Sequence, residues 1–181
     1  MTKNLIMPIN IKPTLTFEIN DSKDLFNKLL EEYSDFDKQY LNPRFALNCS
    51  INSWHLTDWT FQEFFKDDER FQDTASKDSK GCLKVISGLL KYQQHVIKQC
   101  PELEYMKLIT NGIKHCVLND KSRKEKTGLH DGGYSSDYSR HDYDVTRFVI
   151  QLENDRIIDF EKALLKTIDY WEEFLIVNTK K

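Results

Sequence analysis

The chain has 181 residues, of which 39% are hydrophobic and 30% charged, with six glycines and four prolines. This composition excludes a collagen-like, low-complexity or wholly disordered chain, and the length fits a single domain covering residues 1–181. Lysine and arginine together number 26 against 29 aspartates and glutamates, so the net charge is −3. A globally basic nucleic-acid-binding protein is therefore not expected, although a local basic patch is compatible with this balance.

The sequence contains no recognisable membrane-spanning or export segment. Its apolar runs are far shorter than the roughly 20 residues that a membrane-spanning helix needs. Residues 1–12 lack the apolar stretch and small-residue cleavage site of a signal peptide. The four cysteines are widely spaced and form no Cys-x-x-Cys pair: Cys49, Cys82, Cys100 and Cys116. We therefore expect a cytoplasmic protein without membrane contact, whose reduced thiols are buried as small apolar groups.

The first third of the chain predicts a strand followed by two helices. Apolar residues alternate with polar ones from Ile9 to Asn20, which is typical of a half-buried strand. Capping residues at 20–22 then begin a helix, and its apolar positions follow the spacing of one helical face: Leu25, Phe26, Leu29, Leu30, Tyr33 and Phe36. A second helix is predicted to begin at Asn42-Pro43 and to run to about Phe65, because proline is favoured at the first helical position.

The rest of the chain predicts three more helices and a late hairpin. Residues 67–79 indicate a solvent-exposed loop, after which Ser79 caps a third helix; Pro101 ends that helix and begins a fourth, which reaches Val117. Residues 119–142 contain almost no apolar side chains and predict a long polar loop. A strand over 145–152, a turn and a short strand over 156–158 follow, and Asp159 caps the last helix.

The order of these elements predicts the fold class. Strands come first and late, with a run of helices between them, so a parallel sheet of alternating strands and helices is not expected. The sequence instead predicts an α+β fold, mainly a bundle of four to five helices. Its small antiparallel sheet would combine the N-terminal strand with the late hairpin.

Strong catalytic motifs are absent from the sequence. There is no phosphate-binding glycine loop, no dinucleotide-binding glycine pattern, no nucleophile elbow and no zinc-ligand spacing. Nucleotide-dependent enzymes, Rossmann oxidoreductases and the common hydrolases are thereby disfavoured, and no cofactor is implied.

Polar side chains interrupt the second and fourth helices at core-like positions. His55 and Asp58 are three residues apart and share a helix face. Asn48, Asn52 and Trp59 follow the same helical stripe, where an unpaired buried polar group costs about 1–3 kcal/mol.

The fourth helix carries a second polar set near its end. Asn111 and His115 are four residues apart, and Lys114 is three from Asn111. Gly112 costs the helix about 1 kcal/mol relative to alanine, so we expect a neighbouring helix or a ligand to pack close to the backbone there.

If these two helices are neighbours, the two polar sets converge in one pocket. The candidate catalytic residues are then His55, Asp58, Asn111, Lys114 and His115. An aspartate that orients a histidine, with a second histidine opposite and a lysine nearby, suits general acid–base cleavage of a phosphodiester. This hypothesis requires the rings of His55 and His115 to lie within about 10 Å of each other.

Three other interpretations of these residues stay open. The same groups could hold Zn, Mn or Fe, because imidazole and carboxylate are common metal ligands. They could bind another kind of ligand, or form a buried hydrogen-bond network that fixes the register of the helices. In the long loop, His130 and His141 lie among aspartates, and a basic run spans residues 121–126; both are interpreted as solvated.

The five residues Asn111–His115 resemble the marker of the HEPN superfamily of prokaryotic toxins and defence ribonucleases. That marker is an arginine followed four to six residues later by histidine; here asparagine replaces the arginine, and three residues lie between it and His115. The resemblance implies a cytosolic helical bundle that cleaves RNA without metal in toxin–antitoxin or phage defence, with His115 as acid/base and His55 and Asp58 in support. The alternatives are a non-catalytic module that contacts a protein partner through its long loop or exposed aromatic residues, and a small His/Asp metalloprotein.

Overall fold

The computed structural model describes residues 16–77, 83–114, 125–132 and 145–179. Over these residues the chain forms five α-helices, a two-stranded antiparallel sheet and a three-stranded antiparallel sheet, which confirms the predicted α+β, mainly helical class. The helices are α1 (Ser22–Lys38), α2 (Pro43–Thr60), α3 (Gly88–Gln99), α4 (Glu102–Lys114) and α5 (Phe160–Asn178). The strands are β1 (Thr74–Lys77), β2 (Leu83–Ile86), β3 (Lys126–His130), β4 (Arg147–Gln151) and β5 (Ile157–Asp159).

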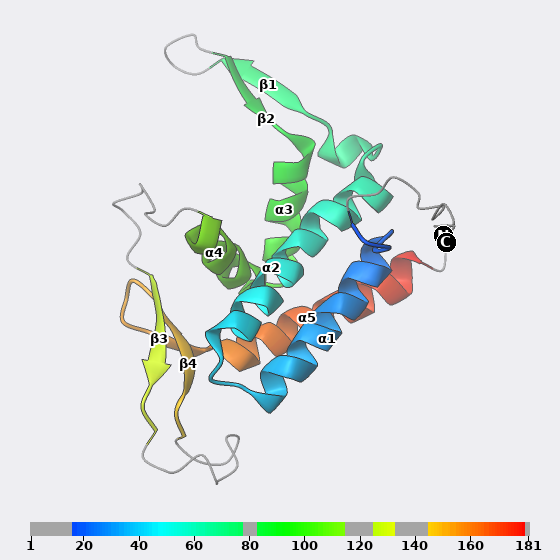
Figure 1. Ribbon diagram of the computed structural model, residues 1–181. Helices are drawn as coiled ribbons and strands as arrows, with labels where there is room; N and C mark the ends of the chain where they lie inside the picture. The colour runs from blue at the N-terminus through cyan, green and yellow to red at the C-terminus, as the bar shows by residue number, and fades with distance from the viewer. Residues whose placement is uncertain (1–15, 78–82, 115–124, 133–144, 180–181) are drawn as a thin grey trace, which may run out of the picture.

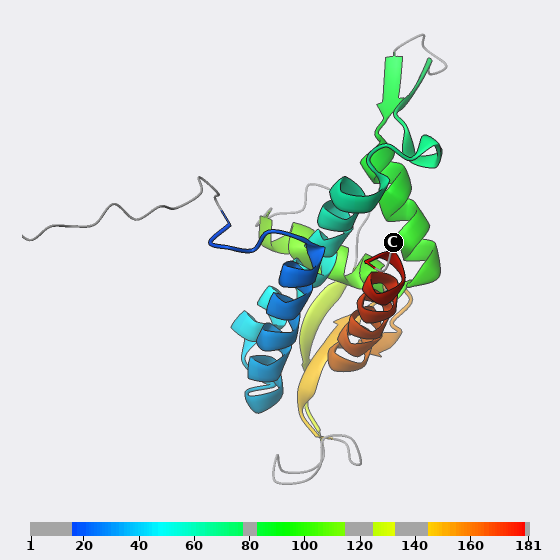
Figure 2. The same cartoon turned by 90° about the vertical axis from the view of Figure 1, so that its right-hand side faces the viewer.

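Helix α2 lies at the centre of the molecule and contacts each of the other four helices. A short π-helical turn, Phe61–Phe65, continues it. The hairpin of β1 and β2 projects as an arm beyond the C-terminal end of α2, while the sheet of β3, β4 and β5 lies near its N-terminal end (Figures 1 and 2). The two sheets are therefore at opposite ends of the bundle.

The core combines apolar packing with a few satisfied polar contacts between α2 and α5. Trp171 is fully buried, and its indole nitrogen donates a hydrogen bond to the backbone oxygen of Ser53 over 3.0 Å. The Ser53 hydroxyl in turn donates to the Thr167 hydroxyl over 2.8 Å. Because each of these buried polar groups has a partner, this contact between α2 and α5 avoids the penalty for an unpaired group.

The capping residues predicted for three helices are confirmed. The side chains of Asp21, Asn42 and Asp159 accept backbone N–H groups in the first turns of α1, α2 and α5. Ser79 lies outside the described residues; α3 begins at Gly88, and its cap is Ser87, whose side chain accepts the N–H of Leu90 over 3.2 Å. The helix predicted to include residues 83–86 is therefore wrong over that stretch, which forms strand β2.

The predicted strand over residues 9–20 is wrong where the structure describes it. Residues 16–19 form a bend and a turn, and Phe17 is 97% exposed with a left-handed backbone φ of 47°. Residues 9–15 lie outside the described part of the chain, so their strand stays a prediction.

The late hairpin is confirmed, but its third strand comes from elsewhere. Strands β4 and β5 pair as predicted, and β3 adds to the other side of β4, giving the order β3-β4-β5. The sequence predicts residues 126–130 as part of the long polar loop; they instead form β3, because their backbone pairs with β4 although their side chains carry no alternating pattern. The rest of that loop is described only at 125 and 131–132.

Candidate functional site

His55 and Asp58 lie together on α2, as their spacing predicts. His55 is exposed, whereas Asp58 is half-buried, and its Oδ1 accepts a hydrogen bond from Gln93 of α3 over 2.8 Å. Burial raises the pKa of the Asp58 carboxyl, and this outweighs the lowering by His55 and by the hydrogen bonds from Gln93 and Thr57. Asp58 therefore serves the contact between α2 and α3, with His55 on the solvent side.

Asn111 and Lys114 lie in the last turn of α4, where Asn111 is half-buried and Lys114 is exposed. Lys107 of α4 places its ammonium 5.8 Å from the ring centre of Trp54 on α2. Asn111 and Lys114 follow Lys107 by four and seven residues, which is about 6 and 10 Å along the helix axis. The structure places His55 and Asp58 together on α2; how far this pair lies from Asn111 and Lys114 stays a prediction. His115 lies outside the described residues, so its distance from His55 stays a prediction.

The asparagines of the polar stripe on α2 take part in a contact with α1. Asn48 donates to Glu32 over 2.9 Å, and Asn52 accepts from Lys28 over 3.2 Å. Lys28 and Glu32 form an ion pair of 3.0 Å with each other. This network agrees with the interpretation that polar residues at these positions fix the register of two helices.

Asp58 also lines an acidic recess of about 630 Å³ at the C-terminal end of α2. Its other lining residues are Asn20, Asp21, Trp59, Gln62 and Glu63. Three carboxylates around one recess oppose the approach of a phosphate group. Among the described residues, no group of three or more His, Cys, Asp or Glu side chains is placed to hold a metal ion.

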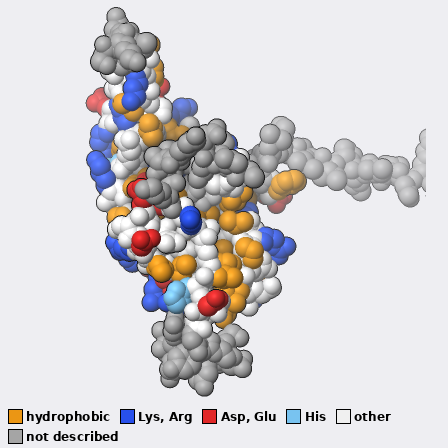
Figure 3. All heavy atoms as spheres, turned by 90° about the vertical axis from the view of Figure 1, so that its left-hand side faces the viewer, with side chains coloured by type: hydrophobic (Ala, Val, Ile, Leu, Met, Phe, Trp, Pro, Cys, Tyr) orange, Lys and Arg blue, Asp and Glu red, His pale blue; other side chains and the backbone are white. Residues whose placement is uncertain are grey.

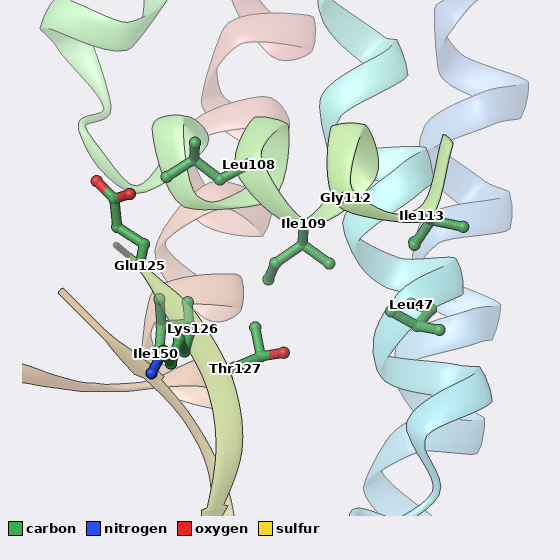
Figure 4. A pocket seen from close by; sticks show the side chains of 9 residues that line it. All are labelled: Leu47, Leu108, Ile109, Gly112, Ile113, Glu125, Lys126, Thr127 and Ile150. Carbon is green, nitrogen blue, oxygen red and sulfur yellow. The ribbon is translucent and has the colours of Figure 1, made fainter. Parts of the chain in front are cut away.

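An apolar groove lies at the other end of α2, between this helix, α4 and the sheet. Its main part has a volume of about 320 Å³. The lining residues are Leu47, Leu108, Ile109, Gly112, Ile113, Glu125, Lys126, Thr127 and Ile150. Ile109 projects from α4 into the space between Thr127 of β3 and Leu47 of α2 (Figure 4). On this side of the molecule, hydrophobic side chains gather in a band at the surface (Figure 3).

A second, smaller recess of about 70 Å³ continues the groove toward the start of α2. Leu47, Ile109 and Thr127 line both parts. The smaller part adds Pro43, Ala46, Ser50, Phe148, Val149 and Phe160. The two recesses are therefore neighbours beside β3.

The sheet register explains why the groove follows the edge of β3. Thr127 is opposite Ile150, which is opposite Ile158, so these three side chains share the sheet face that packs on the helices. Ile150 is 2% exposed and belongs to the core. Within the described residues β3 pairs with no strand other than β4, so no described strand covers its other edge beside the groove.

Two residues at the rim of the groove, Glu125 and Gly112, lack a close partner among the described residues. The Oε2 atom of Glu125 is buried and accepts no hydrogen bond from a described residue. At Gly112, an added Cβ would meet no described atom within 4 Å. Among the described residues no helix packs close against Gly112, which borders the groove; a ligand at this position stays a prediction.

The groove could not be found from the sequence. Leu47, Ile109 and Ile113 have the spacing of ordinary core positions, and β3 has no apolar alternation. Only the separation between the helices and the edge of the sheet distinguishes these side chains from buried ones.

Comparison with protein-family profiles, with curated proteins and with solved structures finds no match to this chain. Within the described residues, no helix combines the length and the apolar content needed to cross a membrane.

Proposed function

We propose that this protein is a non-catalytic interaction module, and that its groove binds an extended apolar segment as an additional strand beside β3. The observation that carries this proposal is the open space between Thr127 and Leu47, roofed by Ile109, next to an unpaired strand edge. Binding by strand addition uses backbone hydrogen bonds for affinity and pockets for alternate side chains for specificity.

The dimensions of a sheet support this mode of binding. A strand added to β3 would lie about 4.8 Å from it, with alternate side chains on the face shared by Thr127 and Ile150. That face points toward Leu47 and Ile109, so each second side chain of the bound segment would enter the groove. An unpaired strand edge also exposes backbone groups that such a segment would satisfy.

Geometry favours this function over phosphodiester cleavage. The recess next to His55 is lined by Asp21, Asp58 and Glu63, whose charges oppose a phosphate. The HEPN-like, RNase-type role with His115 as acid/base, and the metalloprotein alternative, stay predictions.

Fluorescence anisotropy with a labelled octapeptide in which valine and threonine alternate tests the proposal. Titrated in excess, this peptide should bind the full chain better than a peptide of equal composition with its valines consecutive, because only alternation places the valines on one face. Leu47→Asp should weaken binding at least tenfold, or about 1.4 kcal/mol, because it puts a carboxylate into the apolar wall.

The matched control is Leu83→Asp, which introduces the same change at a side chain that is 68% exposed on the distant β1–β2 arm. It should leave binding unchanged. Equal binding of the two peptides, or equal loss in the two variants, would contradict the proposal.

A further inference from the structure

The β1–β2 arm carries an exposed apolar face. Leu83 is 68% exposed and Val85 is 56% exposed. They are two positions apart on β2, and Ala75 of β1 is opposite Val85, so the three side chains share one face of the arm. A two-stranded hairpin is only marginally stable in water by itself, and it gains stability from a third strand or a surface to pack against. The arm therefore has the properties of one half of a contact.

Strand β2 also has an edge at which a further strand could pair. Among the described residues its ladder partner is β1, and no described strand covers its other edge. An edge strand that carries apolar side chains is a template for pairing with another chain. Because β2 has four residues and β3 has five, β2 can pair with β3 over its whole length.

We propose that the β1–β2 arm of one copy of this chain occupies the groove of a second copy, with β2 added to the sheet beside β3. This inference rests on the proposed function, because it identifies the partner that the groove binds. The joined sheet has the strand order β1-β2-β3-β4-β5, in which the first two strands come from one copy and the other three from its neighbour.

The groove-facing side of β3 matches the apolar face of the arm. Thr127 and Leu129 are two positions apart and share this side, and Leu129 is opposite Phe148, which lines the smaller recess. Leu129 is nevertheless 55% exposed. Leu83 and Val85 of an added β2 would cover Leu129 and enter the groove beside Thr127. Apolar side chains of both copies are thereby removed from water, which favours association.

The same alternation directs the charged residue of β2 away from the groove. Lys84 lies between Leu83 and Val85, so its side chain is on the opposite face of the added strand. On that face of β3, an added Cβ at Gly128 would meet no described atom within 4 Å. The ammonium group of Lys84 therefore stays in water when the two aliphatic side chains are buried.

The arm cannot reach the groove of its own copy, because the two lie at opposite ends of α2 (Figures 1 and 2). Leu47 in the groove and Thr60 at the end of α2 are thirteen residues apart, or about 20 Å along the helix axis. The contact therefore forms between copies and joins two different surfaces. A pair joined in this way keeps a free arm at one end and a free groove at the other, so assembly continues to a ring or a filament.

Sedimentation velocity over a range of protein concentrations tests this arrangement. The average mass of the unchanged chain should rise with concentration beyond the mass of a dimer. Leu83→Asp on the arm and Leu47→Asp in the groove should each stay monomeric, because each puts a carboxylate into one half of the contact. The matched control is Val177→Asp on α5, where the side chain is 61% exposed outside both surfaces; this variant should associate like the unchanged chain.

A mixture of the two variants distinguishes this contact from others. Leu83→Asp keeps an intact groove and Leu47→Asp keeps an intact arm, so an equimolar mixture should form heterodimers with one copy of each and nothing larger. Because Leu47 is half-buried, the mixture is repeated with Leu129→Asp, which changes an exposed side chain on the same side of β3. Mixtures that stay monomeric with both groove variants would overturn the proposal. So would groove variants that still dimerise by themselves, since that result indicates contact between two arms.

Competition with the alternating valine–threonine octapeptide tests whether the arm occupies the groove. An excess of this peptide should return the assembled unchanged chain to monomers, because peptide and arm bind the same surface. The peptide with consecutive valines should not. If the alternating peptide binds monomeric Leu83→Asp but leaves the assembly of the unchanged chain intact, the proposal is overturned.

The outcomes separate the two proposals. If the peptide binds the groove but the chain stays monomeric at every concentration, the arm proposal is overturned and the proposed function stands. If neither the peptide nor the arm binds, both fail. In the anisotropy experiment the peptide is in excess over the protein and hence over its arms, so Leu83→Asp remains a neutral control there.

Discussion

The base of the β1–β2 arm and the groove beside β3 are both built from apolar side chains next to a small sheet, yet one is closed and the other open. At the arm base, Tyr92 stacks on Phe65 with ring centres 5.0 Å apart and meets Phe71 at 5.3 Å. A Cβ added to Gly88 would overlap the backbone oxygen of Phe71, whereas one added to Gly112 would meet no atom of the described residues within 4 Å.

This difference shows that apolar content does not by itself mark a binding surface. Protein interiors are packed as densely as organic crystals, so a well-packed apolar region has no room for a ligand. At the arm base there is no room for a Cβ on Gly88 beside Phe71, while the groove leaves about 320 Å³ between Leu47, Ile109 and Thr127. Incomplete packing next to a free strand edge is therefore the feature that distinguishes the groove.

Truncating one side chain in each region should produce the largest contrast in stability. Tyr92→Ala should lower the free energy of unfolding by about 3–5 kcal/mol, because it removes a ring that is 1% exposed and leaves a cavity. Leu47→Ala should lower it by no more than about 1 kcal/mol, because this half-buried side chain already borders open space. Urea denaturation of both variants measures the difference; similar losses would show that the groove is closed in solution.

The next contrast is between Gly88 at the arm base and Gly112 at the groove. Substitution by alanine should change the free energy of unfolding in opposite directions at these two positions. Gly88→Ala should destabilise the protein by about 1–3 kcal/mol, because the backbone at Phe71 has to move. Gly112→Ala should stabilise it by up to about 1 kcal/mol, because alanine favours the helix and the new methyl group meets no atom. Thermal unfolding of each variant tests this pair, and a loss of stability at Gly112 would indicate an occupant at that end of the groove.

The smallest expected effect is on the pH dependence of the free energy of unfolding, which Asp58 and Glu102, both outside the groove, should change in opposite directions. Burial raises the pKa of Asp58. The contribution of this carboxyl to the free energy of unfolding therefore becomes less favourable as pH rises from its pKa in the unfolded chain to its pKa in the folded protein. The pKa of Glu102 is lowered: burial would raise it, but its hydrogen bond with Lys166 outweighs this effect. The stability that the ionised Glu102 contributes is therefore lost as pH falls through its pKa in the folded protein.

Two conservative variants test these signs. Relative to the unchanged chain, Asp58→Asn should gain stability at pH 7 and lose that gain in acid, while Glu102→Gln should lose stability at pH 7 and lose little in acid. Urea denaturation at the two pH values measures both. A stability difference that does not depend on pH would contradict the assigned pKa directions.

The helices were largely predictable because their signals are local. Apolar spacing along α1 and the caps at Asp21, Asn42 and Asp159 depend on residues within one or two turns of each other. The third helix was misplaced because Leu83 and Val85 are apolar residues two positions apart that fit either period over so short a run. Ser87 was the better cap, with strand β2 before it.

The candidate site was less predictable, since its chemistry depends on distances between remote segments. Spacing alone identified the proximity of His55 and Asp58, but not the partner Gln93, which comes from another helix. For Asn111 and Lys114 the pattern predicted a shared face of α4, but the crossing of α4 over α2 decides what that face meets.

The sequence by itself determined which segments become helices, where most of them begin, and that helices dominate the fold, because propensity, periodicity and capping act over a few neighbouring residues. The tertiary structure alone decided that residues 126–130 become an edge strand, that Gly112 faces open space, and that Leu47 and Ile109 line a groove rather than the core. These properties follow from how closely distant segments approach each other, and no local pattern of residues encodes that distance.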